Sequence, residues 1–168
     1  MKTLSSNEPF VDVILPNYNK SKFVEDAINS VIAQTYSNWH LYIIDDNSTD
    51  SSVEIINKFS SLANVTVVKL HKNKGPAFCR NYGMRISQSK YIAFIDSDDG
   101  WTKNKLERQI SFMEKNNFNF TYTDHTLFFD VNGQKKFEKK TNLRDYYDYD
   151  SFTKNSQINT TTMIITRS

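Results

Sequence analysis

The chain alternates between short apolar runs and longer segments in which apolar residues recur at helical spacing. Four runs are rich in β-branched and aromatic residues and have the length of strands. They are VDVILP (Val11–Pro16), LYIIDD (Leu41–Asp46), VTVVKL (Val65–Leu70) and YIAFID (Tyr91–Asp96). We expect each run to form a buried strand.

Helical patterns fill the gaps between these runs. Apolar residues from Phe23 to Ile32 recur at i, i+1, i+4, i+5, i+8 and i+9, which places them in one stripe on a helix. A second helix is predicted over 51–61 behind a Ser-Thr-Asp N-cap signal, a third from Pro76 to about Ser87, and a fourth over 103–116. Alternating strands and helices predict an α/β fold, with a parallel sheet and helices on both faces.

Polar side chains follow every predicted strand. The sequences are PNYNK, DDNSTD, HKNKG and DSDDG, in chain order. Because ligands of open α/β sheets bind at the carboxyl ends of the strands, we expect these four loops to share one edge. The acidic residues gathered there would be Asp45, Asp46, Asp96, Asp98 and Asp99.

Such a concentration of negative charge requires a cation. Oxygen ligands suit Mg²⁺ or Mn²⁺, which typically take one or two carboxylates and share the remaining positions with a phosphate group. Lys20, Lys74 and Arg80 lie in or beside the same loops and could neutralise phosphates. The sequence therefore predicts a metal site that holds a phosphorylated ligand.

An Asp-x-Asp triplet alone supports other interpretations. It could be a solvated turn that caps the helix starting near Lys103. A haloacid-dehalogenase-type phosphatase would need Thr or Val where Gly100 stands. A response-regulator receiver would carry its acidic pair after the first strand, whereas here the pair follows the second.

Length and charge limit the number of domains and the kinds of partner that we expect. The 168 residues suit one domain, and 21 basic against 19 acidic side chains leave a net charge of only +2. No broad polyanion-binding face is expected, and no nucleic-acid partner. A single cysteine, Cys79, excludes a disulfide within the chain and favours the cytoplasm. No stretch approaches the ~20 apolar residues of a spanning helix, although a longer parent protein could be peripheral to the membrane.

Several motifs, taken in order and spacing, resemble the nucleotide-sugar domain of glycosyltransferase family 2. They are VDVILPNYNKSKFVEDAINSVIAQTYSNWHLYIIDDNSTDSS, NKGPAFCRNYGMRISQSKYIAFIDSDDGW and KLERQISFME, followed by a strand-and-hairpin signal in TYTDHTLFFDVNGQK. The resemblance covers about residues 11–133. It implies a GT-A fold, a Rossmann-like and mostly parallel sheet, in one domain over residues 1–168. Residues 134–168 would begin an incomplete acceptor-side region.

The resemblance also implies a nucleotide site. Pro16 and Tyr18 would line the base pocket, and Asp46, with Asp45 as the fallback, would accept a hydrogen bond from the uracil imide. Lys20 and Arg80 would approach the diphosphate of a UDP-sugar. The other residues assigned to nucleotide binding are Asp96 and Ser97.

The donor sugar and the metal are assigned to the same loop. Asp96 would hold the ribose or a water molecule of the metal, and Asp98 would bind Mn²⁺ or Mg²⁺ directly. Asp99 would face the hydroxyl groups of the donor sugar. The metal would stabilise the diphosphate leaving group.

Members of this family invert configuration, which requires a base opposite the leaving group. In the family this is an aspartate in an acidic segment after a strand resembling TTTMIITRS, so we expect the base beyond Ser168 and assign no catalytic residue here.

Two functions are therefore possible for the chain. The parent protein would transfer a sugar from a UDP-sugar to a polysaccharide or lipid-linked glycan. Alternatively, residues 1–168 only bind the nucleotide sugar, without turnover. Sugar, linkage and oligomeric state leave no mark in the sequence.

Overall fold

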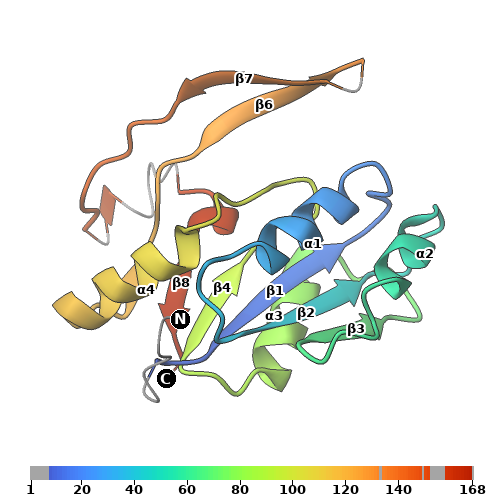
Figure 1. Ribbon diagram of the computed structural model, residues 1–168, viewed down its shortest axis with the longest axis horizontal. Coiled ribbons are helices and arrows are strands. Elements are labelled where there is room, and N and C mark those ends of the chain that lie inside the picture. The colour runs from blue at the N-terminus through green and yellow to red at the C-terminus, as the bar shows by residue number, and fades with distance from the viewer. Residues whose placement is uncertain (1–7, 133, 149, 152–157, 168) are drawn as a thin grey trace.

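The computed structural model describes residues 8–132, 134–148, 150–151 and 158–167 of the chain. Figure 1 shows how its helices and strands are arranged. Their bounds are β1 Val11–Asn17, α1 Val24–Ile32, β2 Trp39–Asp45, α2 Ser52–Asn57, β3 Val65–Lys69, α3 Pro76–Ile86, β4 Tyr91–Phe94, α4 Lys105–Asn116, β5 Phe120–Thr121, β6 Thr126–Val131, β7 Gln134–Lys140, the 3₁₀ turn η1 Thr160–Thr162 and β8 Ile164–Thr166.

Of the described strands, six form one sheet in the order β3-β2-β1-β4-β8-β5. β1 is parallel to both of its neighbours, so that Val11 lies opposite Trp39 of β2 and Tyr91 of β4. β3 is also parallel to β2, whereas β8 is antiparallel to β4 and β5. The predicted α/β fold with a mostly parallel sheet is confirmed.

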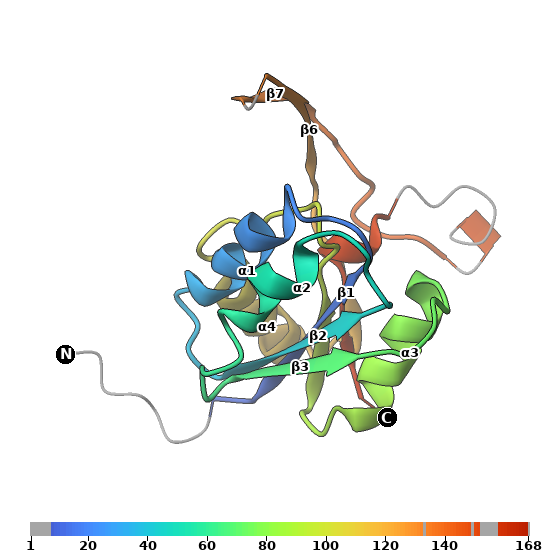
Figure 2. The ribbon, with the colours of Figure 1, turned by 90° about the vertical axis from the view of Figure 1, so that its right-hand side faces the viewer.

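Helices cover both faces of this sheet, as the alternating pattern predicted. Figure 2 shows α3 on one face and α1, α2 and α4 on the other. Alternate side chains of β1 serve the two faces: Val13 packs in the cluster that contains Ile28 of α1, and Ile14 packs in the cluster with Met84 of α3. Gly83 allows α3 to lie close to the sheet, because a Cβ there would come within 2.6 Å of Ile14. No described helix has the length and apolar character needed to cross a membrane.

The predicted second helix is too long. It was expected to reach Ser61, but α2 ends at Asn57. The next two amides, those of Lys58 and Phe59, donate to carbonyls three residues back, at 3.1 and 3.0 Å. Such bonds belong to tight 3₁₀-type turns, which is why the regular helix stops there. The bounds of the other predicted helices agree closely with the structure.

The hairpin formed by β6 and β7 stands apart from the main sheet (Figure 1). Its strands are antiparallel, and Phe128 lies opposite Phe137 with the ring centroids 6.0 Å apart. Asn132 at the turn has φ of 56°, a conformation that asparagine adopts more readily than most residues. The hairpin predicted from TYTDHTLFFDVNGQK is therefore confirmed.

Candidate functional site

The four loops after β1–β4 meet at one edge of the sheet, as predicted. The amide of Lys20, in the first loop, donates to Ser52 Oγ at 3.0 Å, which joins this loop to the start of α2. The amide of Lys74, in the third loop, donates to Asp46 at 2.7 Å. The Lys20 ammonium lies 2.6 Å from Asp98 in the fourth loop. Contacts between sequence-distant loops thus assemble one site.

Asp45 holds the loop that follows β2. Its carboxylate accepts hydrogen bonds from Asn17 Nδ2 at 2.9 Å, from Ser48 Oγ at 2.6 Å and from the Ser48 amide at 3.0 Å. Asp45 and Asn17 are opposite each other in the β1–β2 ladder, and both are buried. Asp45 therefore has a structural role: it holds the loop after β2 against the end of β1.

Asp46 fixes the loop between β3 and α3. Its two oxygens accept from the amides of Lys74 and Gly75, each at 2.7 Å, and the side chain is buried. Gly75 has φ of 86°, which side-chain-bearing residues rarely adopt. Each carboxylate oxygen can accept a second hydrogen bond, so these contacts leave acceptor capacity for the uracil imide. The assignment of Asp46 to the base stays a prediction.

Cys79 lies in the first turns of α3, close to Asp46. The thiol is fully buried. Burial raises its pKa to about 12, and the negative charge of Asp46 adds to this effect. The thiol is therefore protonated at neutral pH and lies against the Asp46 carboxylate.

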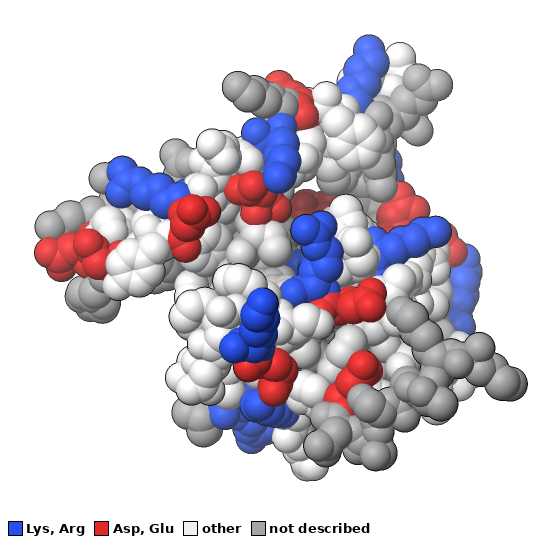
Figure 3. Space-filling view, turned by 60° about the vertical axis from the view of Figure 1, so that its left-hand side comes forward, with Lys and Arg blue, Asp and Glu red and all other residues white. Residues whose placement is uncertain are grey.

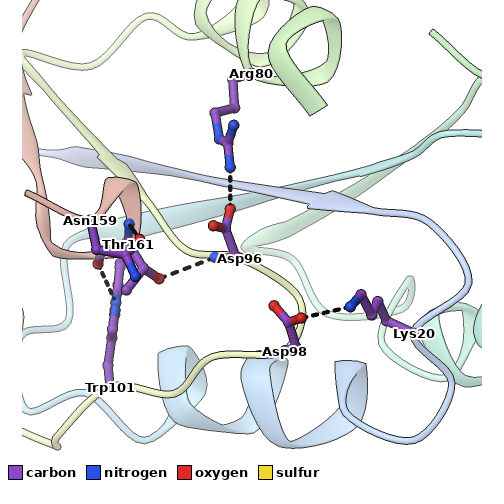
Figure 4. A network of polar contacts seen from close by, with 7 residues as sticks. All are labelled: Lys20, Arg80, Asp96, Asp98, Trp101, Asn159 and Thr161. Carbon is purple, nitrogen blue, oxygen red and sulfur yellow. Dashed lines mark hydrogen bonds and ion pairs between the residues drawn. The ribbon is translucent and has the colours of Figure 1, made fainter. Parts of the chain in front are cut away.

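Two ion pairs hold the loop after β4. Lys20 Nζ contacts Asp98 Oδ2 at 2.6 Å, and Arg80 Nη2 contacts Asp96 Oδ1 at 2.5 Å. Figure 4 shows the two pairs side by side, with the basic residues coming from the first loop and from α3. The side chains that we assigned to the diphosphate and to the metal are thus in direct contact. In this structure Lys20 and Arg80 supply the positive charge that the acids require.

Arg80 also has an unpaired donor. Its Nε is buried and has no hydrogen-bond partner among the described residues. Buried donors without a partner are uncommon and costly in folded proteins. A phosphate oxygen is an acceptor that would satisfy this N–H beside Asp96.

The remaining predicted residues lie along the same edge. Pro16 is buried within β1, whereas Tyr18 just beyond it is 45% exposed. Ser97 is buried inside the β4 loop. Burial raises the pKa of Asp99, the charges of Asp96 and Asp98 raise it further, and the Thr161 hydroxyl opposes them. The placement of these residues is compatible with their assignments but does not test them.

A cavity of about 1400 Å³ extends from the β4 loop towards the hairpin. Asp98 and Asp99 line it on one side, Trp101 and Lys105 line it near α4, and Phe128 lines it from β6. Basic and acidic side chains are interspersed over the face shown in Figure 3.

The carboxylates suit a metal site that a bound phosphate completes better than a site formed by protein side chains alone. Among the described residues, no three His, Cys, Asp or Glu side chains lie close enough together to hold a metal alone. Asp96 and Asp98 each contact their basic partner through one oxygen. Two carboxylates with oxygens to spare fit Mg²⁺ or Mn²⁺ when a phosphate completes the coordination.

Sequence reasoning missed Thr161, which supports the β4 loop from η1. Its Oγ1 accepts from the Asp96 amide at 3.1 Å, and its carbonyl accepts from Trp101 Nε1 at 2.9 Å. Because the first of these bonds joins the Asp96 amide to a side chain and not to a neighbouring strand, β4 does not reach Asp96 as predicted; it ends at Phe94. No local sequence pattern could have shown these contacts, because they join segments 60 and 65 residues apart.

Lys105 was missed as well. Its side chain is buried, with Nζ 2.8 Å from Gln109 Oε1 and 4.3 Å from the centroid of the Trp101 ring. Burial lowers the pKa of Lys105 to about 7. A lysine at the start of a helix is ordinarily solvated, so its position in the sequence gave no sign of this burial.

Comparison with known proteins yields consistent matches. A family model for glycosyl transferase family 2 matches residues 12–168. TuaG of Bacillus subtilis, a glycosyltransferase named for teichuronic acid biosynthesis, is 35% identical over 161 residues, which are 95% of this chain and 63% of TuaG. WfgD of Escherichia coli, a UDP-Glc:alpha-D-GlcNAc-diphosphoundecaprenol beta-1,3-glucosyltransferase, is 39% identical over 117 residues, 70% of this chain and 46% of WfgD.

Solved structures show the same architecture. Staphylococcus aureus TarS, residues 1–349 in complex with UDP, matches with a TM-score of 0.63 and 28% identity over 66% of this chain and 34% of that one. The chain thus spans less than two thirds of the length of TuaG, of WfgD and of that TarS chain.

Proposed function

Because the chain belongs to glycosyltransferase family 2 and has the GT-A fold, we propose that it forms the donor site of an inverting, metal-dependent enzyme. This enzyme moves a hexosyl or related sugar from a UDP-sugar to a hydroxyl group of a polysaccharide or lipid-linked glycan. Residues 134–168 would begin the acceptor-side region of the same domain.

The main support for this proposal is the two ion pairs Lys20–Asp98 and Arg80–Asp96. A metal–diphosphate group needs carboxylates for the metal and cations for the phosphates, and here both kinds of side chain converge on one loop. The Arg80 Nε–H, which has no partner in the part of the chain that the structure describes, adds a donor at the same place. On ligand binding, Lys20 and Arg80 would turn from the carboxylates to phosphate oxygens.

Uracil is the base that we assign to the nucleotide. TarS was solved with UDP, and WfgD is named for a UDP-glucose donor. Tyr18, exposed at the edge of the site, would pack against the uracil ring, and Asp46 would accept from its imide N–H. Pro16 would shape the pocket from within β1, with Asp45 holding the loop beneath.

The side chains of the β4 loop would each contact a different part of the donor or the metal. Asp98, together with Asp96, would hold Mg²⁺ or Mn²⁺, which when bound stabilises negative charge on the departing diphosphate. Asp96 and Ser97 would position the ribose, and Asp99 would accept hydrogen bonds from the donor sugar. Lys20 and Arg80 would balance the charge that develops as the bond to the phosphate breaks.

Inversion also needs a base on the face of the sugar opposite the diphosphate. The acids of the β4 loop would serve the donor side, and the resemblance to family 2 implies an aspartate in a separate acidic segment as this base. Residues 1–168 alone would then bind the donor and transfer it slowly or not at all. A longer protein that includes the acidic segment should recover transfer, and its failure to do so would contradict this placement.

A calorimetric comparison of UDP, CDP and GDP in the presence of Mn²⁺ tests the nucleotide assignment. Cytosine is as small as uracil but carries an acceptor where uracil has the imide N–H. UDP should therefore bind at least about tenfold more tightly than CDP, because Asp46 would face an acceptor in CDP. Equal affinities for the two would refute the role of Asp46, and tighter binding of GDP would refute the uridine assignment.

A further inference from the structure

We propose that Thr161 is a positioning residue for the metal-binding loop, residues 96–101. This inference rests on the proposed function, because the loop would hold the metal there. Thr161 itself would touch neither the metal nor the diphosphate. It would act by fixing where the loop leaves the sheet and where it returns to α4.

Thr161 contacts both ends of the loop (Figure 4). At the first end, the Ile95 amide still donates to the strand carbonyl of Ile14 at 3.1 Å, but the next amide, that of Asp96, donates to Thr161 Oγ1 at 3.1 Å. At the second end, Trp101 Nε1 donates to the Thr161 carbonyl at 2.9 Å. One residue therefore sets the span between the first acid of the loop and the tryptophan that closes it.

Thr161 can do this because its own position is fixed. Asn159 caps η1, with Oδ1 3.3 Å from the Thr161 amide, and Gln109 Nε2 of α4 donates to the Thr162 carbonyl at 3.1 Å. Directly afterwards, Ile164 pairs with Ala93 of β4. The turn is thus held by the helix on one side and by the sheet on the other, and Thr161 is 7% exposed.

The Thr161 hydroxyl contacts the loop at the Asp96 amide and at the Asp99 carboxyl, whereas the hydroxyl of its neighbour does not reach the loop. Thr162 is also buried, but its Oγ1 donates to the Asn159 carbonyl at 2.6 Å, within the turn itself. The same substitution by valine at the two positions removes one buried hydroxyl in each case. Only the substitution at Thr161 leaves the Asp96 amide without its partner.

The test measures UDP binding by calorimetry with and without Mn²⁺, together with thermal unfolding, for wild type, Thr161→Val, Thr161→Ser and Thr162→Val. We expect Thr161→Val to weaken Mn²⁺-supported UDP binding at least about tenfold, because it removes both the acceptor of the Asp96 amide and the hydroxyl that contacts Asp99. Thr161→Ser should restore it, because serine keeps the hydroxyl. Thr162→Val should lower the unfolding temperature to a similar extent and leave UDP affinity within about twofold of wild type.

Each outcome decides the matter. If Thr161→Val binds UDP as wild type does, or if both valine variants weaken binding equally, the positioning role is overturned while the proposed function stands. If wild type shows no Mn²⁺-dependent UDP binding, the proposed function fails and this inference fails with it. If Thr161→Val does not fold, Trp101→Phe replaces it, since it removes the bond to the Thr161 carbonyl and should also weaken Mn²⁺-supported binding.

Discussion

Replacing Lys20 by glutamine should change the affinities for metal and for nucleotide in opposite directions. In this structure the Lys20 ammonium lies 2.6 Å from Asp98, the proposed metal ligand. Without nucleotide, this ammonium competes with a metal ion for the same carboxylate. With nucleotide bound, Lys20 would instead contact a phosphate oxygen. Lys20→Gln should therefore favour the metal alone and disfavour UDP.

The magnitudes follow from the geometry. A unit charge about 4 Å from a divalent ion costs about 2 kcal/mol at the dielectric constant of water. The side chains of Lys20 and Asp98 are 40% and 43% exposed, so salt screening reduces this to about 1 kcal/mol, or about fivefold in metal affinity. A lost charge-assisted hydrogen bond to phosphate costs about 1.5–3 kcal/mol, so UDP affinity should fall by at least about tenfold.

Two titrations at physiological salt measure these effects. Electron paramagnetic resonance of free Mn²⁺ gives metal affinity without nucleotide, and calorimetry gives UDP affinity at saturating Mn²⁺. Lys90→Gln is the matched control, because Lys90 forms an ion pair of 2.7 Å with Glu114 away from the site. If Lys20→Gln moves both affinities in the same direction, or neither, the partner exchange proposed for Lys20 is wrong.

Three further predictions concern buried groups. Because the pKa of Lys105 is about 7 in the folded protein and about 10.5 when unfolded, the unfolded chain binds more protons above pH 7. The free energy of unfolding of wild type, measured in denaturant titrations, should therefore rise from pH 7 to 9 by up to about 1.4 kcal/mol per pH unit relative to Lys105→Met. Parallel pH profiles of the two proteins would contradict this. The buried Cys79 thiol, with its pKa raised to about 12, should react with iodoacetamide at pH 8 only as fast as the protein unfolds, and rapid labelling of native protein would refute its burial. Gly83→Ala should destabilise the protein by about 1–3 kcal/mol, since the new Cβ meets Ile14 at 2.6 Å, whereas Gly100→Ala, with nothing within 4 Å, should not; equal melting temperatures for the two would contradict the close packing of α3.

Much of the fold could be predicted from local pattern. Strands β1–β4 are covered by helices on both faces, so their apolar runs are nearly continuous and easy to recognise. The meeting of Lys20, Arg80 and Asp98 also followed from topology, because carboxyl ends of parallel strands share one edge. The end of α2 was not predictable in the same way, since the change to tighter turns after Asn57 leaves the composition unchanged.

The contacts within the site were harder to predict. Asp45 and Asp46 lie at a strand end like the acids after β4, yet Asp45 accepts from Ser48 of its own loop and Asp46 accepts from amides of the loop before α3. A carboxylate at a strand end has the same sequence signature in either role. Thr161 depends on β8, which is inserted antiparallel between β4 and β5, a pairing that no local pattern indicates.

The central claim, a metal–diphosphate site at the β4 loop, is tested most directly by calorimetric titration of UDP with and without Mn²⁺. The variants are Asp98→Asn, which keeps the shape of the side chain and removes its charge, and Glu114→Gln, which breaks the distant ion pair with Lys90. We predict UDP binding that depends on Mn²⁺ in wild type and in Glu114→Gln and falls at least about tenfold in Asp98→Asn. Mn²⁺-dependent binding of undiminished affinity in Asp98→Asn would contradict the account.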